Sequence, residues 1–301
     1  MPNIKFAAID IGSNAVRLLI SNVFETPEGP AYRKLSLTRV PVRLGKDVFS
    51  TGTISDERWR QFMHTMHAYK HLMQVHKIES IRACATSAMR DADNGARLVQ
   101  QVKDETGIQI DIIDGKTEAA IIYSTQLQDY IRLNHSYLYI DVGGGSTEIT
   151  LFVGKSVRAS RSFNIGTLRI LQNQITDNEW KELKLWVRKA TKGQPTVHAI
   201  GSGGNINKIF KMLRKRVGKP ITFDELQSFH AHLESYSVQE RVQWLDLRPD
   251  RADVIVPAAK IFLRVMRNGN AKKIFVPKFG LADGIVKQLY DEWKQAALQQ
   301  R

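Results

Sequence analysis

Three glycines between two carboxylates form the part of the sequence best suited to chemistry. The stretch reads Asp141-Val142-Gly143-Gly144-Gly145-Ser146-Thr147-Glu148 and lies between two apolar runs that predict strands. Glycines in a tight turn let a ligand approach the backbone, and successive N–H groups there can surround an anion such as phosphate. Carboxylates beside a phosphate often hold a divalent cation. We therefore predict phosphate contacts at Gly143, Gly144, Gly145 and Ser146, and metal ligands at Asp141 and Glu148.

A second stretch near the N-terminus repeats this pattern. Asp10-Ile11-Gly12-Ser13-Asn14 also lies between apolar runs, and both copies read Ile-Asp-(Ile or Val)-Gly. Three glycines alone fit an ordinary hairpin turn equally well, but two copies of a strand–turn–strand unit indicate two similar lobes that face each other across a cleft. A third turn, Ile200-Gly201-Ser202-Gly203-Gly204-Asn205, precedes a helical pattern, and a turn that opens a helix can bind an anion. We expect its phosphate contacts at Gly201, Gly203 and Gly204.

This set of turns resembles the sugar kinase/actin/Hsp70 superfamily. The resemblance implies two actin-like, ribonuclease H-like lobes that clamp a nucleotide or a polyphosphate. Strand-like runs alternate with helical runs along the chain, which independently predicts an α/β fold. We expect lobe I over residues 1–127 and lobe II over residues 128–301, with the last helix, at about 282–300, packing back on lobe I.

The elements that position these turns have clear local signals. Strand-like runs occur at 4–10, 16–24, 31–40, 78–85, 109–113, 137–142, 147–153, 156–164 and 272–277. Ser55 can cap a helix that extends to about His76. Gly107 can end a second helix, which covers about residues 93–106. The spacings Thr176–Glu179 and Thr222–Glu225 are typical of capping boxes, in which a threonine and a glutamate satisfy each other's backbone N–H groups.

The chain is strongly basic. Its 301 residues carry a formal net charge of +14, and basic residues cluster at 181–192, 208–219 and 264–278. Such a charge distribution attracts polyanions and raises their rate of encounter. Nucleic acid is the competing partner, but no zinc-finger, RNP or recognition-helix pattern is present, so we expect none.

The single cysteine, Cys84, lies inside an apolar run. One cysteine cannot form a disulfide framework and is typical of a reducing compartment, so we expect a cytoplasmic protein with Cys84 in its core. The first residues enter a strand without a charged-then-apolar leader. No apolar run approaches the ~20 residues of a membrane span, so we expect no contact with membranes.

Six stretches of the chain carry recognisable motifs in a fixed order. They are Asp10–Asn14, Ala85–Arg90, Gly115–Ala119, Asp141–Glu148, Gly201–Asn205 and Leu247–Asp253. Together they resemble the exopolyphosphatase/guanosine pentaphosphate phosphohydrolase (Ppx/GppA) family in its short, two-domain form. The resemblance implies hydrolysis of the terminal phosphate of inorganic polyphosphate or of guanosine pentaphosphate, with a divalent cation, normally Mg²⁺. One departure is Thr117, since the family often has two adjacent glutamates where this chain has Thr117-Glu118.

The resemblance also implies roles for residues in the first lobe. It assigns general-base catalysis to Glu118 and a catalytic phosphate contact to Arg90, with further phosphate contacts at Ser13, Asn14 and Arg17 and a metal ligand at Asp10. From the residues alone, Glu118 fits better as a glutamate that stabilises the start of a helix through the helix dipole than as a catalytic base. Arg17, on a strand, also fits a position that faces solvent.

Two other functions stay open at this point. The first is a phosphotransferase of the same superfold, although no motif for a sugar site is evident. The second is a non-hydrolytic binder of guanosine polyphosphates or nucleotides, against which the retained Glu118 argues. The sequence does not rank polyphosphate, guanosine pentaphosphate and nucleotides as substrates. It contains no heptad pattern, and it leaves a homodimer open.

Overall fold

The computed structural model describes residues 4–123, 135–154, 156–277 and 280–299. Contacts divide the chain into two units, the first formed by Met1–Thr125 with Phe279–Arg301 and the second by Gln126–Lys278. The predicted boundary between residues 127 and 128 lies outside the described residues. Both units combine a mixed sheet with helices, so the predicted α/β class is confirmed.

The sheet of unit 1 has the order β3-β2-β1-β4-β5. Its strands are β1 (Ile4–Ile11), β2 (Val16–Thr26), β3 (Gly29–Val40), β4 (Ser80–Ala85) and β5 (Ile110–Ile112). The first three strands are antiparallel neighbours, and β4 and β5 run parallel to β1. Nearly every residue of β1 is buried, as expected for a central strand with helices on both faces of the sheet.

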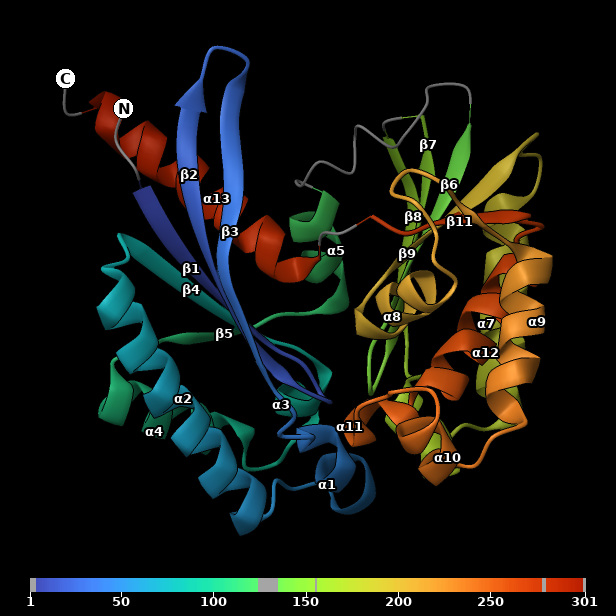
Figure 1. Cartoon of the computed structure of the whole chain (residues 1–301), viewed down its shortest axis with the longest axis horizontal. Coiled ribbons are helices and arrows are strands. Elements are labelled where there is room, and N and C mark those ends of the chain that lie inside the picture. The colour runs from blue at the N-terminus through green and yellow to red at the C-terminus, as the bar shows by residue number, and fades with distance from the viewer. Residues whose placement is uncertain (1–3, 124–134, 155, 278–279, 300–301) are drawn as a thin grey trace. The chain divides into compact units, whose positions relative to one another are not determined.

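Helices cover this sheet in the described part of unit 1 (Figure 1). They are α1 (Leu44–Thr51), α2 (Asp56–His76), α3 (Ser87–Asp91), α4 (Gly95–Thr106), α5 (Gly115–Tyr123) and α13 (Leu281–Gln299). Helix α2 packs against β2 and α4, whereas α13 packs against β1, β2, β4 and α5. The ring of Phe6 on β1 meets that of Tyr290 on α13 edge to face, with the centroids 6.4 Å apart. The last helix of the described chain therefore belongs to the core of the first unit.

The sheet of unit 2 repeats this topology. In the order β10-β11-β9-β6-β7-β8, its strands are β6 (Ser136–Val142), β7 (Thr147–Val153), β8 (Ser156–Phe163), β9 (Val197–Ser202), β10 (Ile221–Thr222) and β11 (Lys273–Phe275). Read from the other edge, β8-β7-β6-β9-β11 has the same order and the same strand directions as β3-β2-β1-β4-β5. Strand β6 therefore corresponds to β1, which confirms the duplication predicted from the two Ile-Asp-x-Gly stretches.

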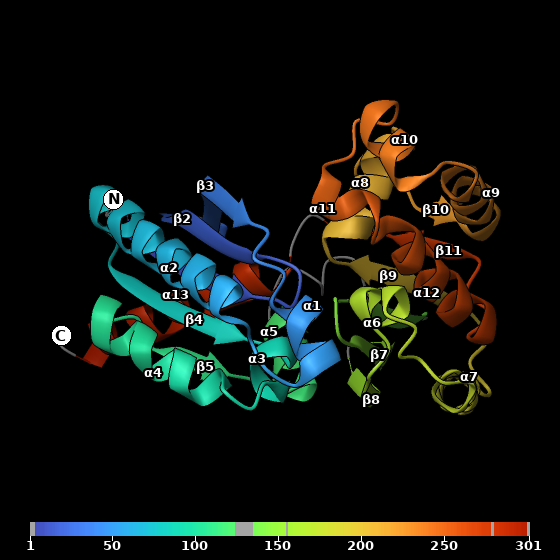
Figure 2. The ribbon, with the colours of Figure 1, turned by 90° about the horizontal axis from the view of Figure 1, so that it is seen from below.

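The helices of unit 2 pack around a large apolar core. They are α6 (Thr167–Leu171), α7 (Asp177–Thr191), α8 (Gly204–Met212), α9 (Phe223–Glu234), α10 (Val238–Gln243), α11 (Pro249–Ala252) and α12 (Ile255–Asn268). Helix α12 contacts β6, β9 and the helices α6, α7, α8, α9 and α11, and its side chains Ile255, Ile261, Phe262 and Met266 are fully buried. Figure 2 shows α7 and α12 side by side.

Most local signals in the sequence are confirmed. The Ser55 side chain accepts a hydrogen bond from Arg58 N at the start of α2, and Gly107 ends α4 in the left-handed region. Both predicted capping boxes form, at α7 and at α9. A third capping box, Ser237–Glu240, starts α10 and was not predicted, and neither were the short helices α1 and α3.

Candidate functional site

The glycine-rich turn of unit 2 connects β6 to β7. Gly143 N donates to Ser146 O over 2.9 Å, which closes the turn. Its carbonyl groups are held by the start of α6: Thr167 N donates to Gly143 O (3.1 Å), and Leu168 N to Gly144 O (2.8 Å). The side chain of Arg169 donates from Nε to Gly145 O over 2.9 Å. Three successive carbonyl groups of the turn therefore point towards α6.

These contacts fix the direction of the N–H groups in the same turn. In a trans peptide the C=O and the following N–H lie in one plane and point in opposite directions. Because the carbonyls of Gly143, Gly144 and Gly145 point towards α6, the N–H groups of Gly144, Gly145 and Ser146 point away from it. Successive N–H groups with a common direction can bind an anion, as the sequence predicts.

Gly166 allows this close approach of α6 to the turn. A Cβ atom at Gly166 would lie 2.2 Å from Gly144 O and 2.4 Å from the carbonyl carbons of Gly144 and Gly145. The backbone of Gly166 is extended, with φ −131°, so space rather than conformation requires glycine here. Gly166 is not among the site residues expected from the sequence. The available signal was a glycine between a strand-like run and a helix.

Asp141 and Glu148 are direct partners across β6 and β7. Directly opposite residues of an antiparallel pair lie on the same face of the sheet, with Cβ atoms about 4.5–5.5 Å apart. The hydroxyl of Ser162 donates to Glu148 Oε1 over 2.9 Å, and that of Tyr139 lies 3.4 Å from Asp141 Oδ2. Glu148 is 5% exposed. Two like charges at opposite positions destabilise a strand pair, so this arrangement favours a bound cation.

The donor set around this pair suits magnesium. Mg²⁺ prefers oxygen ligands and usually binds through one or two carboxylates, together with water and substrate phosphates. Asp141 and Glu148 supply two such carboxylates. The turn at Gly203 lies close beside the first of them, since a Cβ atom at Gly203 would come within 3.2 Å of Asp141 Oδ1. Among the described residues, no group of three or more His, Cys, Asp or Glu side chains is placed to hold a metal ion. A site here would thus depend on the Asp141–Glu148 pair.

The third glycine-rich turn follows β9, the parallel neighbour of β6. Gly203 has φ +103°, which other residues rarely adopt, and Gly204 is the first residue of α8. The N–H groups at this helix start are suited to an anion. Gly201 lies within β9, and a Cβ atom there would contact the side chains of Ile274 (2.8 Å) and Ile206 (3.0 Å). Packing alone therefore explains glycine at 201, and its phosphate contact stays a prediction.

In unit 1, the corresponding turn is closed by Gly12 N, which donates to Ala15 O over 3.1 Å. Ser13 is buried, and its hydroxyl lies 2.9 Å from that of Ser87 at the start of α3. Ser13 O accepts from Gly45 N (2.8 Å), and Asn14 O accepts from Arg43 N (3.2 Å). Ser87 was missed by the sequence analysis because its partner is 74 residues away.

Asp10 and Arg17 of unit 1 form an ion pair over 2.6 Å. They are direct partners across β1 and β2, at the positions that Asp141 and Glu148 occupy in unit 2. The side chain of Asp10 is 8% exposed and that of Arg17 is 34% exposed. The predicted metal contact of Asp10 and phosphate contact of Arg17 would therefore each compete with this ion pair.

Arg90 and Glu118 lie at the carboxyl ends of β4 and β5, where ligands commonly bind in open α/β sheets. Arg90 donates from Nη1 to Ile113 O over 3.2 Å, and its Nε lies 3.5 Å from Asp91 Oδ1. Asp114 starts α5 by accepting from Thr117 N over 2.7 Å. Hydrogen bonds from Thr117 lower the pKa of Asp114, and the charges of Arg90 and Lys116 lower it further. Glu118 is half-buried in the first turn of α5.

The described part of the chain contains no helix that is both long enough and apolar enough to cross a membrane. The thiol of Cys84 is 1% exposed, and burial raises its pKa to about 12. Cys84 thus lies in the core, as predicted.

Comparison with known proteins places these features in one family. The family model described as the Ppx/GppA phosphatase family matches residues 23–292. The chain is similar to exopolyphosphatase 1 of Mycobacterium tuberculosis, at 23% identity over 95% of this chain and 88% of that protein. It is 24% identical to a guanosine-5'-triphosphate,3'-diphosphate pyrophosphatase of Photobacterium profundum, over 98% of this chain and 61% of that protein.

A shorter match has higher identity. A bifunctional 3-dehydroquinate synthase/phosphatase of Fusobacterium nucleatum is 33% identical over 58% of this chain, which spans only 27% of that protein. Among solved structures, an exopolyphosphatase from Cytophaga hutchinsonii has a TM-score of 0.82 at 22% identity, covering 96% of this chain and 98% of that one. This similarity shows that the two chains share a fold.

Proposed function

Because the chain belongs to the Ppx/GppA phosphatase family, we propose that it removes the terminal phosphate from inorganic polyphosphate. Water attacks the terminal phosphorus, and the bond to the bridging oxygen of the chain breaks. The products are inorganic phosphate and a polyphosphate shorter by one unit. Guanosine pentaphosphate is the alternative substrate, because one relative is named for each activity.

The main support is the direction of three peptide N–H groups in unit 2. The carbonyls of Gly143, Gly144 and Gly145 are held by α6, so the N–H groups of Gly144, Gly145 and Ser146 have a common direction. Such groups bind phosphate oxygens without needing to reorient as charge develops, which is the usual source of electrostatic stabilisation in phosphoryl transfer. We assign phosphate binding to these groups, with Gly203 and Gly204 at the start of α8 as a second contact.

We assign the divalent cation to Asp141 and Glu148. A bound Mg²⁺ supplies positive charge that offsets the charge of the phosphate oxygens. The two carboxylates lie on the same face of the sheet and accept hydrogen bonds from the hydroxyls of Tyr139 and Ser162. These hydroxyls orient the carboxylate oxygens. At the corresponding positions in unit 1, Arg17 neutralises Asp10, so Asp10 is a weaker metal ligand.

We assign proton transfer to Glu118 and phosphate binding to Arg90. In this reaction Glu118 accepts a proton from the attacking water, which is general-base catalysis. Its position depends on Asp114, which accepts from Thr117 N and whose carbonyl accepts from Glu118 N over 2.9 Å. Arg90 is anchored by Ile113 O, in the segment that leads into the same helix. The guanidinium has five donors, so its contacts with Ile113 O and Asp91 leave others for phosphate oxygens.

Measuring phosphate release tests the proposal and separates it from its competitors. The chain is incubated with Mg²⁺ and, separately, with long-chain polyphosphate, guanosine pentaphosphate and ATP. We expect the unchanged protein to release phosphate from polyphosphate, and we expect the Glu118→Gln variant to lose this activity. Transfer of phosphate to an added acceptor without release to water would identify a phosphotransferase. Tight binding without turnover of any of the three compounds would identify a non-hydrolytic binder, and the proposed function would then be wrong. A cytoplasmic location and a homodimer stay predictions.

A further inference from the structure

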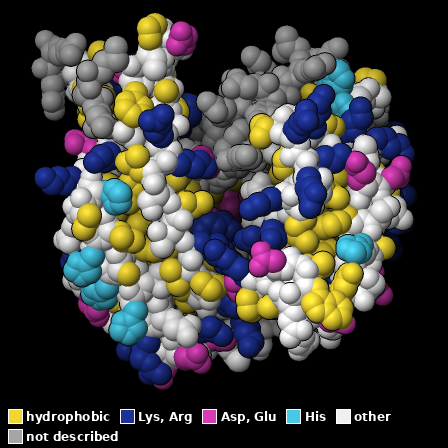
Figure 3. Space-filling view, viewed as in Figure 1, with side chains coloured by type: hydrophobic (Ala, Val, Ile, Leu, Met, Phe, Trp, Pro, Cys, Tyr) yellow, Lys and Arg dark blue, Asp and Glu magenta, His cyan; other side chains and the backbone are white. Residues whose placement is uncertain are grey.

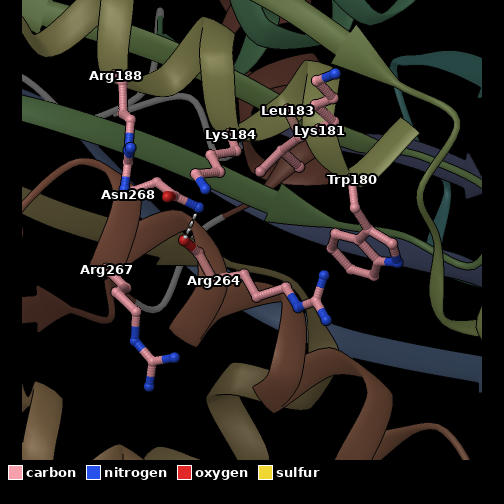
Figure 4. Close-up of a pocket in the computed structure, with 8 residues that line it drawn as sticks. All are labelled: Trp180, Lys181, Leu183, Lys184, Arg188, Arg264, Arg267 and Asn268. Atoms are coloured by element: carbon pink, nitrogen blue, oxygen red, sulfur yellow. Dashed lines mark hydrogen bonds between the residues drawn. The ribbon is translucent and has the colours of Figure 1, made fainter. Parts of the chain in front are cut away.

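A basic pocket lies between α7 and α12 of unit 2. Its volume is about 390 Å³, and it is lined by Trp180, Lys181, Leu183, Lys184, Arg188, Arg264, Arg267 and Asn268. Figure 4 shows Lys184 and Arg188 extending from α7 towards Asn268, and Arg264 extending along α12 towards Trp180. Five of the eight lining residues are cations and none is an acid. We refer to this feature as the α7–α12 pocket.

The cations of the α7–α12 pocket are not neutralised by the protein. Within the described part of the chain, none of these five side chains lies within 4 Å of a carboxylate oxygen. By contrast, Glu182 on another face of α7 pairs with Arg161 over 2.7 Å. Like charges gathered at one pocket repel each other, and an anion relieves this repulsion. Figure 3 shows that Lys and Arg also outnumber Asp and Glu on the visible surface of unit 2.

The pocket is separate from the glycine-rich turns of the same unit. Gly143–Gly145 and Gly203 lie at the carboxyl ends of β6 and β9. Helix α12 leads into β11, which runs parallel to β9. The last residues of α12 therefore lie towards the amino ends of β9 and of its parallel neighbour β6. In agreement, a Cβ atom at Gly269 would lie 2.3 Å from Leu138, close to the start of β6. The α7–α12 pocket is therefore not part of the proposed catalytic site.

The side chains in the pocket favour a phosphate chain over nucleic acid. Proteins that bind single-stranded nucleic acid without sequence preference combine cations with aromatic faces on which bases stack. The only aromatic residue that lines the pocket, Trp180, carries the guanidinium of Arg264 4.1 Å from its ring centroid and packs against the core of the unit. The other lining groups, apart from Leu183, are cations and an amide, which match phosphate oxygens.

We propose that the α7–α12 pocket is a second polyphosphate-binding site that holds a part of the chain remote from the phosphate being hydrolysed. Lys184, Arg188 and Arg264 supply the main contacts. A site of this kind retains a long chain between successive cleavages and leaves a substrate of a few phosphates unaffected. The identification of the ligand as polyphosphate rests on the proposed function, whereas the pocket and its charge are independent of it.

The test compares two double variants of the same helix. Lys184→Ala/Arg188→Ala removes two charges from the pocket, and Lys189→Ala/Lys192→Ala removes two exposed charges from α7 and its C-cap that do not line it. Binding of long-chain polyphosphate is measured by calorimetry in EDTA, with a gel to confirm that the chain stays intact. The pocket variant should bind roughly tenfold more weakly, since a charge-assisted contact contributes at least about this factor. The control should bind nearly as the unchanged protein does.

Turnover provides an independent measurement. In the pocket variant, KM for long-chain polyphosphate should rise by a similar factor, while kcat and the KM for tripolyphosphate stay constant. Equal weakening in the two double variants would mean that only the overall charge matters and would overturn the proposal. So would a single-stranded RNA that binds as tightly as polyphosphate and loses as much affinity in the pocket variant. If no substrate is hydrolysed, the proposed function fails, but calorimetry still decides whether the pocket binds polyphosphate.

Discussion

Asp141 and Glu148 face each other across β6 and β7 at the positions where Asp10 and Arg17 form an ion pair across β1 and β2. One duplicated position thus holds opposite charges in unit 1 and like charges in unit 2. Arg17 offsets the charge of Asp10 in the first pair, and we propose that a divalent cation offsets the charges of the second pair. This difference within one chain gives a direct way to test the metal site.

Removing one of the two like charges should stabilise the metal-free protein. In EDTA, Glu148→Gln should raise the free energy of unfolding by about 0.2–1 kcal/mol, because it relieves the repulsion across the strand pair. The glutamine Oε1 can still accept from Ser162. Added Mg²⁺ should raise the Tm of the unchanged protein more than that of the variant, and activity at limiting Mg²⁺ should fall sharply.

The matched control is Asp10→Asn in unit 1. It removes the partner of Arg17, so the free energy of unfolding in EDTA should fall by an amount typical of a partly exposed ion pair, about 0.2–1 kcal/mol. Calorimetric unfolding of both variants, with and without Mg²⁺, provides the comparison. The metal assignment would be refuted if both variants lost stability in EDTA and responded equally to Mg²⁺.

Glu118→Gln should lower kcat without weakening substrate binding. General-base catalysis typically contributes about 10²–10⁴-fold, and glutamine keeps the size of the side chain but cannot accept the proton. If Glu118 only stabilises the helix dipole of α5, the variant should instead lose roughly 0.3–1 kcal/mol of stability and keep nearly normal turnover. Measuring kcat, polyphosphate affinity and Tm on one preparation distinguishes the two roles.

Gly166→Ala should disturb the glycine-rich turn of unit 2. The new methyl group would lie 2.2 Å from Gly144 O, so the turn or α6 must move. A displacement of about 1 Å at a catalytic group can cost on the order of 10²-fold in rate, and we expect a loss of this size in kcat/KM. Gly193→Ala is the control, since its Cβ has no neighbour within 4 Å but its φ of +79° imposes strain. It should lower Tm only, and an equal loss of activity in both variants would contradict the proposed role of Gly166.

Salt should weaken the binding of long substrates more than that of short ones. The Debye length falls from roughly 10 Å at 0.1 M salt to about 3 Å at 1 M, so distant cations stop contributing. KM for long-chain polyphosphate should therefore rise more steeply with salt than KM for guanosine pentaphosphate. Equal slopes would mean that the net charge of +14 serves a partner other than polyphosphate.

Cys84 should be unreactive in the folded protein. Burial raises the pKa of its thiol from 9.0 to about 12, so the nucleophilic thiolate is scarce at pH 8. Alkylation by iodoacetamide should be slow until denaturant is added. As the pH rises above 9, the thiol loses its proton in the unfolded chain at a lower pH than in the folded protein. Cys84 should therefore lower the free energy of unfolding between pH 9 and 12. The Cys84→Ala variant should show a weaker dependence of stability on pH in this range. Rapid labelling under native conditions would contradict this placement.

Local patterns in the sequence were sufficient for most elements and for the duplicated turns. A capping box such as Thr176–Glu179 involves residues three apart, and the glycine-rich stretch of unit 2 forms a hairpin turn between adjacent strands. Helix α1 was missed because its N-cap, Arg43, adopts a left-handed conformation and makes no side-chain cap. The five-residue helix α3 is too short to show an apolar period.

Contacts between distant residues could not be predicted in this way. The hydroxyl pair of Ser13 and Ser87 joins residues 74 apart, and the carbonyls of the unit 2 turn are held by α6, about 24 residues later. The partner of Arg17 was also not recognised: the sequence suggested phosphate or solvent, and the structure has Asp10. In each case the tertiary fold selects the partner of a side chain or backbone group.

The position of α13 has a consequence for how the protein is made. Unit 2 is continuous in the chain, whereas unit 1 needs Phe279–Arg301, which is synthesised after unit 2. Until α13 emerges from the ribosome, Phe6 lacks Tyr290, and Glu25 lacks its hydrogen bond from the Tyr290 hydroxyl and its ion pair with Lys294. Domains generally fold as units during synthesis, so unit 2 can fold while the face of the first sheet that α13 covers is still exposed. The first part of the chain to be translated is therefore the last to complete its core.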